Sequence, residues 1–457
     1  MTFQVRDPVH GFIGLPRAVA RLVETRPLQR LRGIRQLAMA SLVYPGALHT
    51  RFDHTLGVAH VAGLMARSLG MHDDAELVEC AALLHDIGHG PFSHVSEYAL
   101  ERYADRTKLH AEQKKEKIHE LVTAKVIQTD SELLDILGRV RCDEVIQLLG
   151  PGQGRPALRS IVSGPLDADK QDYLLRDSYF CGVQYGVFDI HQMHRSLCLE
   201  GARDEEELMI DPDGIHTIEQ FVLAKYYLTR NVYRHKVRLI SDQMIVRAIM
   251  LGVEVDQYPE LVELYAFDDS EAFVKKYLTW DDARFMQAFA APHLPKCGSL
   301  LQRLIERRLL KRVFTRKVRD FREDVRELVM ALGKKENDAV RAAIEMEVAS
   351  LLSSQFKMEI DPAFVIAHSF SVRSVRESSR NDEAGILVAT SPPRTFESES
   401  TLFASINEAY IDQYVQMYAP VAWPTAAEKN KHCRHAKEGI QEAIESACLK
   451  SLAGVKP

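Results

Sequence analysis

The sequence lacks the marks of several protein classes. Its 457 residues include seven cysteines, an odd number, and none of them stands in a CxxC pair. Neither a disulfide framework nor a zinc ribbon is therefore indicated, and reduced thiols are expected. The first residues, MTFQVRDPVHG, lack the charged-then-apolar order of a signal peptide, and no run approaches the ~20 apolar residues of a membrane helix. We therefore expect a cytoplasmic protein with no membrane partner.

A surplus of positive charge is also missing. The formal net charge is −6 at pH 7, whereas binding driven by phosphate contacts needs an excess of Lys and Arg. The charge does not forbid nucleic acid as a partner, but it gives no electrostatic reason to expect one. One local exception, residues 303–326, holds ten Arg or Lys against four acidic residues. It indicates either a solvated helix face or a groove for phosphates or a subunit contact.

What the sequence does contain is helical periodicity. Apolar residues recur mainly at helical spacing, which predicts a mostly α-helical fold. The clearest expected helices are residues 17–42, interrupted near Pro27, residues 55–70, and residues 74–88, the last of which should end at Gly88.

Strands are expected only as small β-hairpins. Residues 3–5 and 12–15 flank DPVHG, and residues 208–210 and 215–218 flank DPDG, and both intervening segments are typical of turns. The stretch 371–400, which contains Ser, Arg, Asn and SPPR, is the best candidate for a loop or linker.

The sharpest chemical signal is LLHDIGHGPFSH, residues 83–94. A His followed directly by an Asp, among apolar residues, is costly to bury unless both polar groups find partners. A shared divalent cation satisfies both, because neutral imidazole and carboxylate are natural ligands of such ions. Neighbours on a helix point about 100° apart, so His85 and Asp86 can reach one ion only at a helix bend or from a favourable pair of rotamers.

Two more ligands stand at suitable places. His54 lies in HTRFDHTLGV, where the preceding helix should begin, and Asp169 lies in LDADKQDYLLRD, at or near the start of another helix. Together these residues give the order His, His-Asp, Asp that marks the HD superfamily. Core polar residues satisfied by hydrogen bonds are the alternative. The predicted metal ligands are His54, His85, Asp86 and Asp169.

Beyond these ligands, the motifs resemble those of the deoxynucleoside triphosphate triphosphohydrolases. These HD enzymes include the bacterial dNTPases and the human restriction factor that carries a sterile alpha motif. The resemblance covers roughly residues 4–240, and the final third of the chain is thinly matched. The matching segments are DPVHGFIGL (7–15), QRLRGIRQL (29–37), YPGALHTRFDHTLGV (44–58), LLHDIGHGPFSH (83–94), DADKQDYLLRDSYFCGV (167–183), VYRHK (232–236) and RRLLKRV (307–313).

The resemblance implies a domain organisation and a reaction. It implies a helical HD catalytic domain over residues 1–200, with its core at about 46–182 and an N-terminal segment for regulation and sugar contacts. A helical C-terminal lobe over residues 201–457 should complete the active site and carry oligomer contacts. Family members cleave a dNTP to the deoxynucleoside and inorganic triphosphate, with water attacking the α-phosphorus. The implied partners are a dNTP substrate and further copies of the chain, as a dimer or tetramer.

The expected cofactor is one divalent transition metal. A site of two His and two Asp suits manganese, iron, zinc, nickel or cobalt. In the family the metal polarises an α-phosphate oxygen, and magnesium can accompany the nucleotide.

Further histidines match catalytic positions of the family. His89, His94 and His119 match active-site histidines, and His94 is the candidate general acid. Histidine titrates near neutral pH and can supply the proton that the departing 5′ oxygen needs. The family has Asp where this chain has Glu97. The longer side chain of Glu97 puts the contact of this catalytic carboxylate with His119 in question. The alternative for these histidines is a supporting or core role.

The resemblance also implies contacts to the nucleotide. Tyr173 and Asp177, spaced i and i+4, should share one helix face beside the metal, with the tyrosine filling the space that a 2′ hydroxyl would need. Ordinary buried or paired roles are the alternative for each residue. The implied contacts are Arg51 and Lys170 to phosphates, Gln36 and Leu37 to sugar and base, Tyr173 and Asp177 to deoxyribose, and Arg230 and Tyr233 at the far wall.

A regulatory site is a further hypothesis. Activated family members read a guanine nucleotide with an acidic residue, a Gln and an Arg on the first helix. Glu24, Gln29 and Arg32 stand at the matching positions. They imply activation by GTP or a second dNTP, and a surface charge cluster is the alternative.

Three other functions stay open at this point. Another HD hydrolase, for cyclic nucleotides or alarmones, would share the ligands but lack the YPG…RFDH and DxDKxDYLxRD contexts. A two-iron HD oxygenase needs extra ligands, which His89, His94 and His119 could supply. A non-catalytic nucleotide or nucleic-acid sensor would be expected to have lost ligands, whereas all four are intact.

Overall fold

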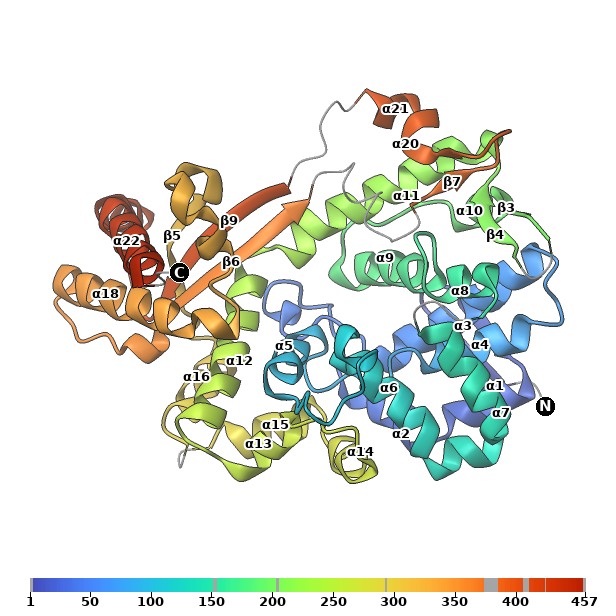
Figure 1. The fold of residues 1–457 in the computed structure, drawn as a ribbon, viewed down its shortest axis with the longest axis horizontal. Coiled ribbons are helices and arrows are strands. Elements are labelled where there is room, and N and C mark those ends of the chain that lie inside the picture. The colour runs from blue at the N-terminus through green and yellow to red at the C-terminus, as the bar shows by residue number, and fades with distance from the viewer. Residues whose placement is uncertain are drawn as a thin grey trace. The chain divides into compact units, whose positions relative to one another are not determined.

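Helices dominate the fold (Figure 1). The computed structural model describes residues 3–150, 154–202, 205–291, 294–373, 385–405, 411–423 and 425–454. In these residues the strands form three small sheets, so the predicted mostly α-helical fold with small β-hairpins is confirmed. Every described helix is too short or too polar to cross a bilayer.

The chain forms two compact units, and each contains segments that are distant in the sequence. The sequence predicts a single division after residue 200, whereas the chain returns to unit 1 twice. One returning segment carries Tyr277 and Phe285, both of which are buried. Unit 1 comprises Met1–His235, Val262–Phe285 and Val375–Ala409, and unit 2 comprises Lys236–Leu261, Met286–Ser374 and Tyr410–Pro457.

The N-terminal hairpin forms as predicted, but the helix expected over residues 17–42 does not. β1 (Phe3–Asp7) pairs antiparallel with β2 (Gly11–Leu15) around the DPVHG turn. Pro27 lies in the first turn of a new helix, where proline is tolerated because its missing N–H would have no partner. The expected helix is therefore broken into α1 (Arg17–Val23), α2 (Arg26–Arg30) and the 3₁₀ turns η1 (Leu31–Gly33) and η2 (Ala40–Leu42).

The two helices that bring the first ligands begin or end beside them. α3 (Arg51–Ser68) starts at a capping box, in which the side chains of Thr50 and Asp53 each accept the other's backbone N–H. α4 (Ala75–Leu84) ends before the predicted residue 88. A Cβ on Gly88 would lie 2.5 Å from the carbonyl oxygen of His119, so the chain leaves the helix to pass close to α6 (Ile118–Thr129).

α9 (Ala168–Cys181) brings the last ligand. Its N-cap, Asp167, accepts the backbone N–H of Lys170, and the helix ends at Gly182 in the left-handed conformation. A Cβ on Gly57 of α3 would lie 1.9 Å from Oδ1 of Asp172. Only glycine therefore allows α3 and α9 to pack with this carboxylate against the α3 backbone.

The second predicted hairpin is wrong. β4 (Glu207–Ile210) pairs with β3 (Leu197–Glu200), and residues 215–218 open helix α11 (Ile215–Leu228). The reason is the DPDG segment, in which the Asp211 carboxylate accepts the N–H of Asp213 and caps a 3₁₀ turn that leads into the helix.

The predicted linker over 371–400 is also replaced by ordered structure where it is described. β6 (Ile366–Arg373) occupies its start, and β7 (Leu387–Val388), β8 (Arg394–Thr395) and α20 (Phe396–Glu399) occupy its end. Residues 374–384 lie outside the described residues. The strands β3, β4, β7 and β8 form one sheet in that order.

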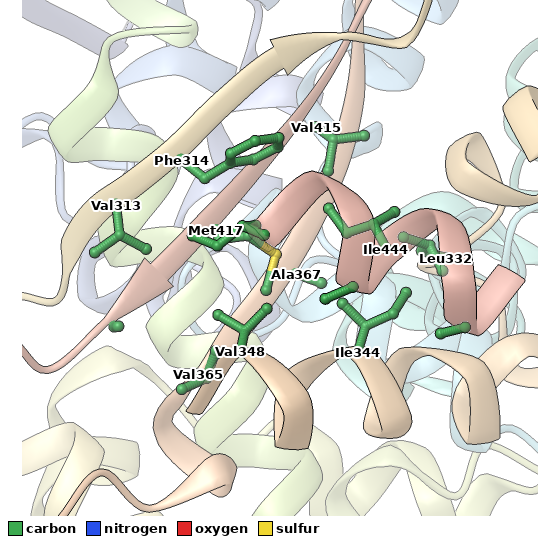
Figure 2. Packing of buried hydrophobic residues seen from close by; sticks show 14 of the residues in the cluster. Val313, Phe314, Leu332, Ile344, Val348, Val365, Ala367, Val415, Met417 and Ile444 are labelled. Carbon is green, nitrogen blue, oxygen red and sulfur yellow. The ribbon is translucent and has the colours of Figure 1, made fainter. Parts of the chain in front are cut away.

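Unit 2 is built on a sheet covered by two helices. Its strand order is β5 (Lys311–Lys317), β9 (Ile411–Ala419) and β6. Figure 2 shows side chains of this sheet, among them Val415 and Met417, pointing toward α18 (Asp338–Phe356) and α22 (Ala426–Gly454). The basic segment 303–326 is mostly strand and turn, so the alternative of a solvated helix face is wrong for most of it.

The other helices complete the two units. They are α5 (His94–Tyr103), α7 (Ser131–Leu149), α8 (Pro156–Val162), α10 (Ile190–Arg195), α12 (Lys236–Glu254), α13 (Pro259–Tyr265), α14 (Glu271–Tyr277), α15 (Asp282–Phe289), α16 (Cys297–Ile305), α17 (Arg326–Met330) and α21 (Thr401–Ala404), and a π-helical turn, η5 (Thr229–Tyr233), follows α11.

Candidate functional site

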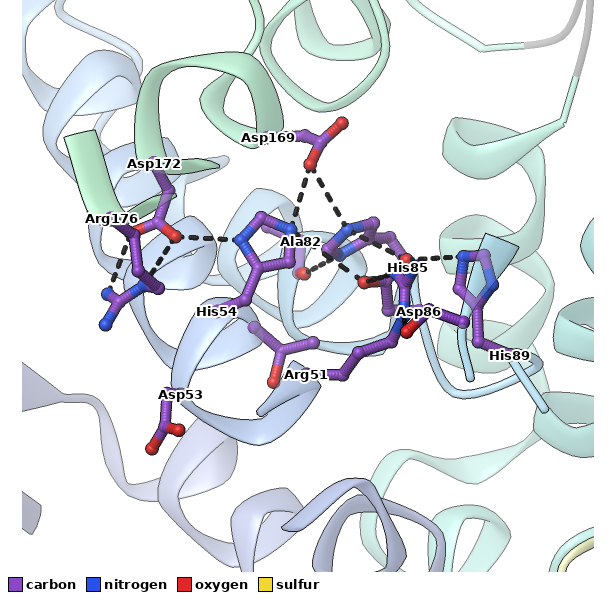
Figure 3. A network of polar contacts seen from close by, with 12 residues as sticks. Arg51, Asp53, His54, Ala82, His85, Asp86, His89, Asp169, Asp172 and Arg176 are labelled. Carbon is purple, nitrogen blue, oxygen red and sulfur yellow. Dashed lines mark hydrogen bonds and ion pairs between the residues drawn. The ribbon is translucent and has the colours of Figure 1, made fainter. Parts of the chain in front are cut away.

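The four predicted metal ligands converge in unit 1 (Figure 3). This group of four side chains is called the metal cluster. His54 lies in the first turn of α3, His85 and Asp86 lie where α4 ends, and Asp169 lies in the first turn of α9. Nε2 of His54 is 2.9 Å from Oδ1 of Asp169 and 3.8 Å from Oδ2 of Asp86. Nε2 of His85 is 3.3 Å from Oδ1 of Asp86 and 3.8 Å from Oδ1 of Asp169. The helix end after Leu84 thus allows neighbouring residues to face one point.

Each imidazole turns its Nε2 toward this point. Nδ1 of His85 donates to the carbonyl oxygen of Ala82 at 2.7 Å, and Nδ1 of His54 donates to Oδ2 of Asp172 at 2.8 Å. Because Nδ1 donates in each case, Nε2 is the nitrogen whose lone pair a metal ion would bind. Without a metal, Nε2 of His54 lies 2.9 Å from Oδ1 of Asp169, to which the protonated ring donates. Nε2 of His85 is buried and has no hydrogen-bond partner among the described residues.

These residues fit a divalent cation. His54, His85 and Asp169 offer ligand atoms that all lie within 4.8 Å of one another, and Asp86 adds a second carboxylate beside them. Two imidazoles and two carboxylates form the mixed donor set that first-row transition metals accept. The orphaned Nε2 of His85 is the observation that a hydrogen-bonded core alone does not explain.

The electrostatics of the cluster favour a cation at its centre. Burial lowers the pKa of His54, but hydrogen bonds to Asp169 and Asp172 outweigh burial and raise that pKa to about 10. Burial raises the pKa of Asp169, but the hydrogen bond from His54 outweighs it and lowers that pKa to about 2. Burial acts in the same way on Asp86, whose pKa the Arg51 guanidinium holds well below its usual range. The negative field that retains a proton on His54 would equally attract a metal ion.

Beside the cluster lies a second group of histidines around Glu97. Nδ1 of His94 donates to Oε1 of Glu97 at 2.6 Å, and Nδ1 of His89 lies 3.3 Å from the same oxygen. Nδ1 of His119 lies 3.8 Å from Oε2 of Glu97. Nε2 of His89 lies 3.1 Å from Oδ1 of Asp86, so this group continues from the metal cluster. The longer arm of Glu97 therefore brings its carboxylate close to all three histidines.

The three histidines differ in their capacity to carry a proton. Burial and the Arg51 cation lower the pKa of His89 to about 3, and burial lowers that of His119. The side chain of His94 is 60% exposed, and its Nε2 lies 3.4 Å from Nη2 of Arg51. Burial raises the pKa of Glu97, but the histidines, His94 first, outweigh burial and hold it below its usual range. His94 with anionic Glu97 is therefore the pair best placed to move a proton.

The two predicted phosphate contacts are engaged with the protein. Arg51 is buried, with its Nη1 in an ion pair with Asp86 and its Nε donating to Oγ of Ser93 at 2.8 Å. Nζ of Lys170 donates to Oδ2 of Asp167 at 2.7 Å and to the carbonyl oxygen of Gly164 at 2.8 Å. Their contact with phosphate stays a prediction.

The predicted sugar contacts form a second buried network. Oδ1 of Asp177 accepts from Nε2 of His49 at 2.7 Å, and Oδ2 accepts from the Tyr233 hydroxyl at 2.5 Å. The rings of Tyr173 and Tyr233 lie edge to face, 6.2 Å apart. Asp169, Tyr173 and Asp177 follow at i, i+4 and i+8 on α9, so one helix face joins this network to the metal cluster.

The other predicted contacts occupy two different settings. Gln36 and Leu37 are buried, and Oε1 of Gln36 has no partner among the described residues. Arg230 is exposed and donates to the Tyr226 hydroxyl at 2.5 Å. Their contact with nucleotide stays a prediction.

The predicted regulatory residues lie on consecutive short turns. Glu24 is exposed after α1. Nε of Arg32 donates to Oε1 of Gln29 at 2.9 Å, and the Arg32 guanidinium lies 3.6 Å from the ring centre of Phe52. The surface charge cluster that was the alternative interpretation describes this geometry equally well.

Several residues around the site were not predicted. Asp172, Arg176 and His10 support His54 from behind, and His49 supports Asp177. The signal for Asp172 and Arg176 was their i, i+4 spacing inside DADKQDYLLRD. Asp282 accepts the backbone N–H groups of Phe92 and Arg35, and no sequence signal points to it.

Two family profiles match the chain. A profile described as the HD domain matches residues 51–162, and one described as the HD associated region matches residues 188–421. An uncharacterized protein of Bacillus subtilis, YwfO, is 30% identical over 326 residues, which cover 67% of this chain and 71% of that protein. The chain belongs to the HD-domain family. It is an HD-superfamily phosphohydrolase, and the resemblance seen in its motifs is confirmed at the level of the family.

Named relatives of this HD protein include triphosphohydrolases. Human deoxynucleoside triphosphate triphosphohydrolase SAMHD1 is 30% identical over 348 residues, covering 68% of this chain and 54% of that protein. This chain thus matches about half the length of that relative. Two crystal structures share the fold: a phosphohydrolase from Bacteroides thetaiotaomicron, at TM-score 0.69 and 23% identity over 92% of this chain and 100% of that one, and a hypothetical protein from Aquifex aeolicus, at TM-score 0.68 and 24% identity over 97% and 100%.

Proposed function

We propose that this HD protein hydrolyses deoxynucleoside triphosphates to the deoxynucleoside and inorganic triphosphate. The observation that carries the proposal is the single face of α9, on which the ligand Asp169 is followed by Tyr173 and Asp177. A metal cluster for phosphate and an aromatic–carboxylate network for a sugar thus share one element. The relatedness to SAMHD1, by its name a deoxynucleoside triphosphate triphosphohydrolase, supports this choice.

The metal ligands His54, His85, Asp86 and Asp169 would hold one divalent cation. When bound, such an ion supplies Lewis-acid polarisation of a phosphate oxygen. Manganese, iron, zinc, nickel and cobalt all suit the donor set.

The chain's own groups supply the proton chemistry. As water attacks the α-phosphorus, a new P–O bond forms and the bond from phosphorus to the 5′ oxygen breaks. That departing oxygen needs a proton, which Nε2 of His94 can give while Glu97 holds Nδ1 and stabilises the charged ring. His89, whose low pKa keeps it neutral, lies between the carboxylates of Glu97 and Asp86.

Selection for deoxyribose would come from the Asp177 network. His49 and Tyr233 hold both oxygens of Asp177, so the carboxylate is fixed before a sugar arrives. Tyr173, one turn before it, would occupy the space of a 2′ hydroxyl.

The test is hydrolysis of each dNTP and of the matching NTP with Mn²⁺. We expect dNTPs to be cleaved and NTPs to be spared, and His85→Ala to abolish turnover together with metal binding. Asp53→Asn is the matched control, since Asp53 neighbours His54 but points away from the cluster (Figure 3). Equal cleavage of NTPs would contradict the role given to Tyr173.

A second candidate is two-metal chemistry. His89, Glu97 and His119 form another group of side chains that could hold an ion, as a two-iron HD oxygenase would require. Metal analysis separates the candidates, since one equivalent per chain supports the hydrolase, and two tightly bound irons with dioxygen consumption support the oxygenase.

Regulation and assembly belong to the same proposal. If Glu24, Gln29 and Arg32 bind an activator, GTP or a second dNTP should raise the rate of dNTP hydrolysis and promote a dimer or tetramer. A rate unchanged by every added nucleotide would remove this part of the proposal.

A further inference from the structure

A fully buried carboxylate behind the metal cluster connects His54 to the N-terminal hairpin. Asp172, on α9, has no exposed surface. Its Oδ2 accepts from Nδ1 of His54 at 2.8 Å, and its Oδ1 accepts from Nε2 of His10 at 2.6 Å. Arg176 donates to both oxygens, from Nε at 2.8 Å and from Nη2 at 2.9 Å. Asp172 is therefore held from three directions, and Figure 3 shows it between Arg176 and His54.

His10 reaches Asp172 from the turn between β1 and β2. Oδ1 of Asp7 accepts the backbone N–H groups of Val9 at 2.9 Å and His10 at 2.8 Å, which shapes the turn. Oδ2 of Asp7 accepts from Nη1 of Arg176 at 2.8 Å. One carboxylate thus both forms the turn and docks it on the guanidinium that holds Asp172.

The charges of this network act on His54. Asp7 and Asp172 carry two negative charges against the single positive charge of Arg176, which leaves a negative excess beside the His54 ring. A carboxylate that accepts Nδ1–H fixes the tautomer of a metal-binding imidazole and makes Nε2 a better ligand. If His10 were absent, Arg176 would be the remaining donor to Oδ1, and it would draw Asp172 away from His54.

We propose that His10 is a positioning residue for the metal ligand His54, acting through Asp172. The N-terminal hairpin is on this account part of the metal centre and not only an edge of the fold. The inference rests on the metal site of the proposed function, but it is independent of which nucleotide is hydrolysed.

The test measures binding of Co²⁺ alone to the purified full chain, by competition with a chelator and by the visible absorption of the bound ion. His10→Phe keeps a ring but removes the donor, whereas His10→Gln places an amide N–H close to the position of Nε2. His60→Gln is the matched control, because the His60 ring lies 5.6 Å from that of His10 while the donors to Asp172 come from His10, His54 and Arg176.

We expect His10→Phe to weaken Co²⁺ binding on the order of tenfold, the lower end for partners of metal ligands, and to shift the Co²⁺ absorption bands. His10→Gln and His60→Gln should bind as the natural protein does. If His10→Phe is obtained only as aggregate, His10→Asn replaces it, since the asparagine amide is too short to reach Asp172.

Two results would overturn the proposal. One is natural Co²⁺ affinity and absorption in His10→Phe with only the melting temperature lowered, which would make the hairpin purely structural. The other is a His10→Gln protein as weak as His10→Phe. The natural protein and its variants could show the expected Co²⁺ affinities while the natural protein cleaves no dNTP. In that case the proposed function fails and the positioning role stands.

Discussion

At the scale of the residue, the histidines of this protein are sorted by their partners. His54 lies between two carboxylates, which stabilise either a proton or a metal ion on its Nε2. His89 lies near the Arg51 cation in a buried place and stays neutral. His94 combines exposure with a carboxylate partner. The three histidines are therefore suited to different roles: His54 to binding a cation, His89 to separating two carboxylates, and His94 to transferring a proton.

Glu97→Gln should separate proton transfer from metal binding. The amide can still accept from His94, but it lacks the negative charge that stabilises a protonated ring, so kcat should fall about 10²- to 10⁴-fold. Co²⁺ affinity should stay unchanged, because Glu97 is outside the group of His54, His85 and Asp169. Steady-state kinetics and chelator competition measure the two effects.

Two variants make this comparison sharper. Glu97→Asp keeps the carboxylate on a shorter arm and should keep most of the activity. Glu101→Gln lies one turn further along α5, where Glu101 pairs with Arg106, and should leave kcat unchanged. A Glu97→Gln protein with natural kcat would contradict the role of Glu97.

Residue types and order were enough to predict which four side chains converge, because imidazoles and carboxylates among apolar neighbours need partners. That these side chains bind a metal stays a prediction. The same reasoning did not identify Asp172. The segment LDADKQDYLLRD offers four aspartates, and only the path of α9 against α3 shows that Asp169 faces the cluster while Asp172 lies behind His54. The partner of Arg51 was hidden for the same reason, since Asp86 lies 35 positions away in the sequence.

At the scale of the element, α9 organises the site with two of its faces. One face carries Asp169, Tyr173 and Asp177, and another carries Asp172 and Arg176 against α3. The sequence predicted α3 and α4 because their periodicity is long and regular. It did not predict their ends, which depend on the capping box at Thr50 and on the close passage of Gly88 by α6. The second predicted hairpin failed because DPDG serves equally well as a turn and as a helix start.

Gly57→Ala tests the contact between α3 and α9. The added Cβ would lie 1.9 Å from Oδ1 of Asp172 and 2.3 Å from Nη2 of Arg176, so one of these groups must move. We expect a loss of about 1–3 kcal/mol in the free energy of unfolding, as overpacked cores show, together with weaker Co²⁺ binding. Urea unfolding measures the stability of the metal-free protein.

Gly14→Ala is the control for this variant, because a Cβ there meets nothing within 4 Å. It should leave both stability and Co²⁺ affinity near their natural values. If Gly57→Ala behaved as Gly14→Ala does, the close packing of Asp172 on α3 would be refuted.

Asp282 gives a pH-dependent prediction for the HGPFSH segment. Its carboxylate accepts the N–H of Phe92 at 2.7 Å, where Phe92 and Ser93 both have positive φ, so it holds a strained turn. Burial raises the pKa of Asp282 from 3.8 to about 6. A folded-state pKa above the unfolded one contributes stability that is present at low pH and is lost as the pH rises through about 6.

The free energy of unfolding of the natural protein, relative to that of Asp282→Asn, should therefore rise as the pH falls from about 7.5 to about 5. The expected gain is about 1 kcal/mol, less than the full shift implies because Asp282 is only partly buried. Thermal or urea unfolding of both proteins across this range measures it. If the stability advantage of the natural protein over Asp282→Asn grew with rising pH, the raised pKa of Asp282 would be contradicted.

At the scale of the whole molecule, the chain divides into two units that local patterns do not reveal. The segment Val262–Phe285 belongs to unit 1, where the Tyr277 hydroxyl donates to the carbonyl oxygen of Gly88 at 3.1 Å. Such contacts join residues far apart in the sequence, and no periodicity encodes them. The predicted metal ligands and catalytic histidines all lie in unit 1, whereas the basic segment 303–326 lies in unit 2.

Ile344→Ala should destabilise unit 2 without altering the metal cluster. Ile344 is fully buried in the core shown in Figure 2, so its truncation should cost about 2–5 kcal/mol in the free energy of unfolding. Met346→Ala, on the same helix but 55% exposed, is the control and should cost about 0.5 kcal/mol or less. Co²⁺ affinity of the folded protein should be natural in both, and a joint loss of affinity in Ile344→Ala would show that the units are not separable in this sense.

The most direct test of the account is the identity of the phosphorus product. The protein is incubated with each dNTP and Mn²⁺ in oxygen-18-enriched water, and the products are read by phosphorus NMR and mass spectrometry. Attack at the α-phosphorus predicts inorganic triphosphate that carries the label on a terminal phosphate, an unlabelled deoxynucleoside, and no product from His85→Ala. Pyrophosphate with a labelled deoxynucleoside monophosphate would contradict the proposed reaction.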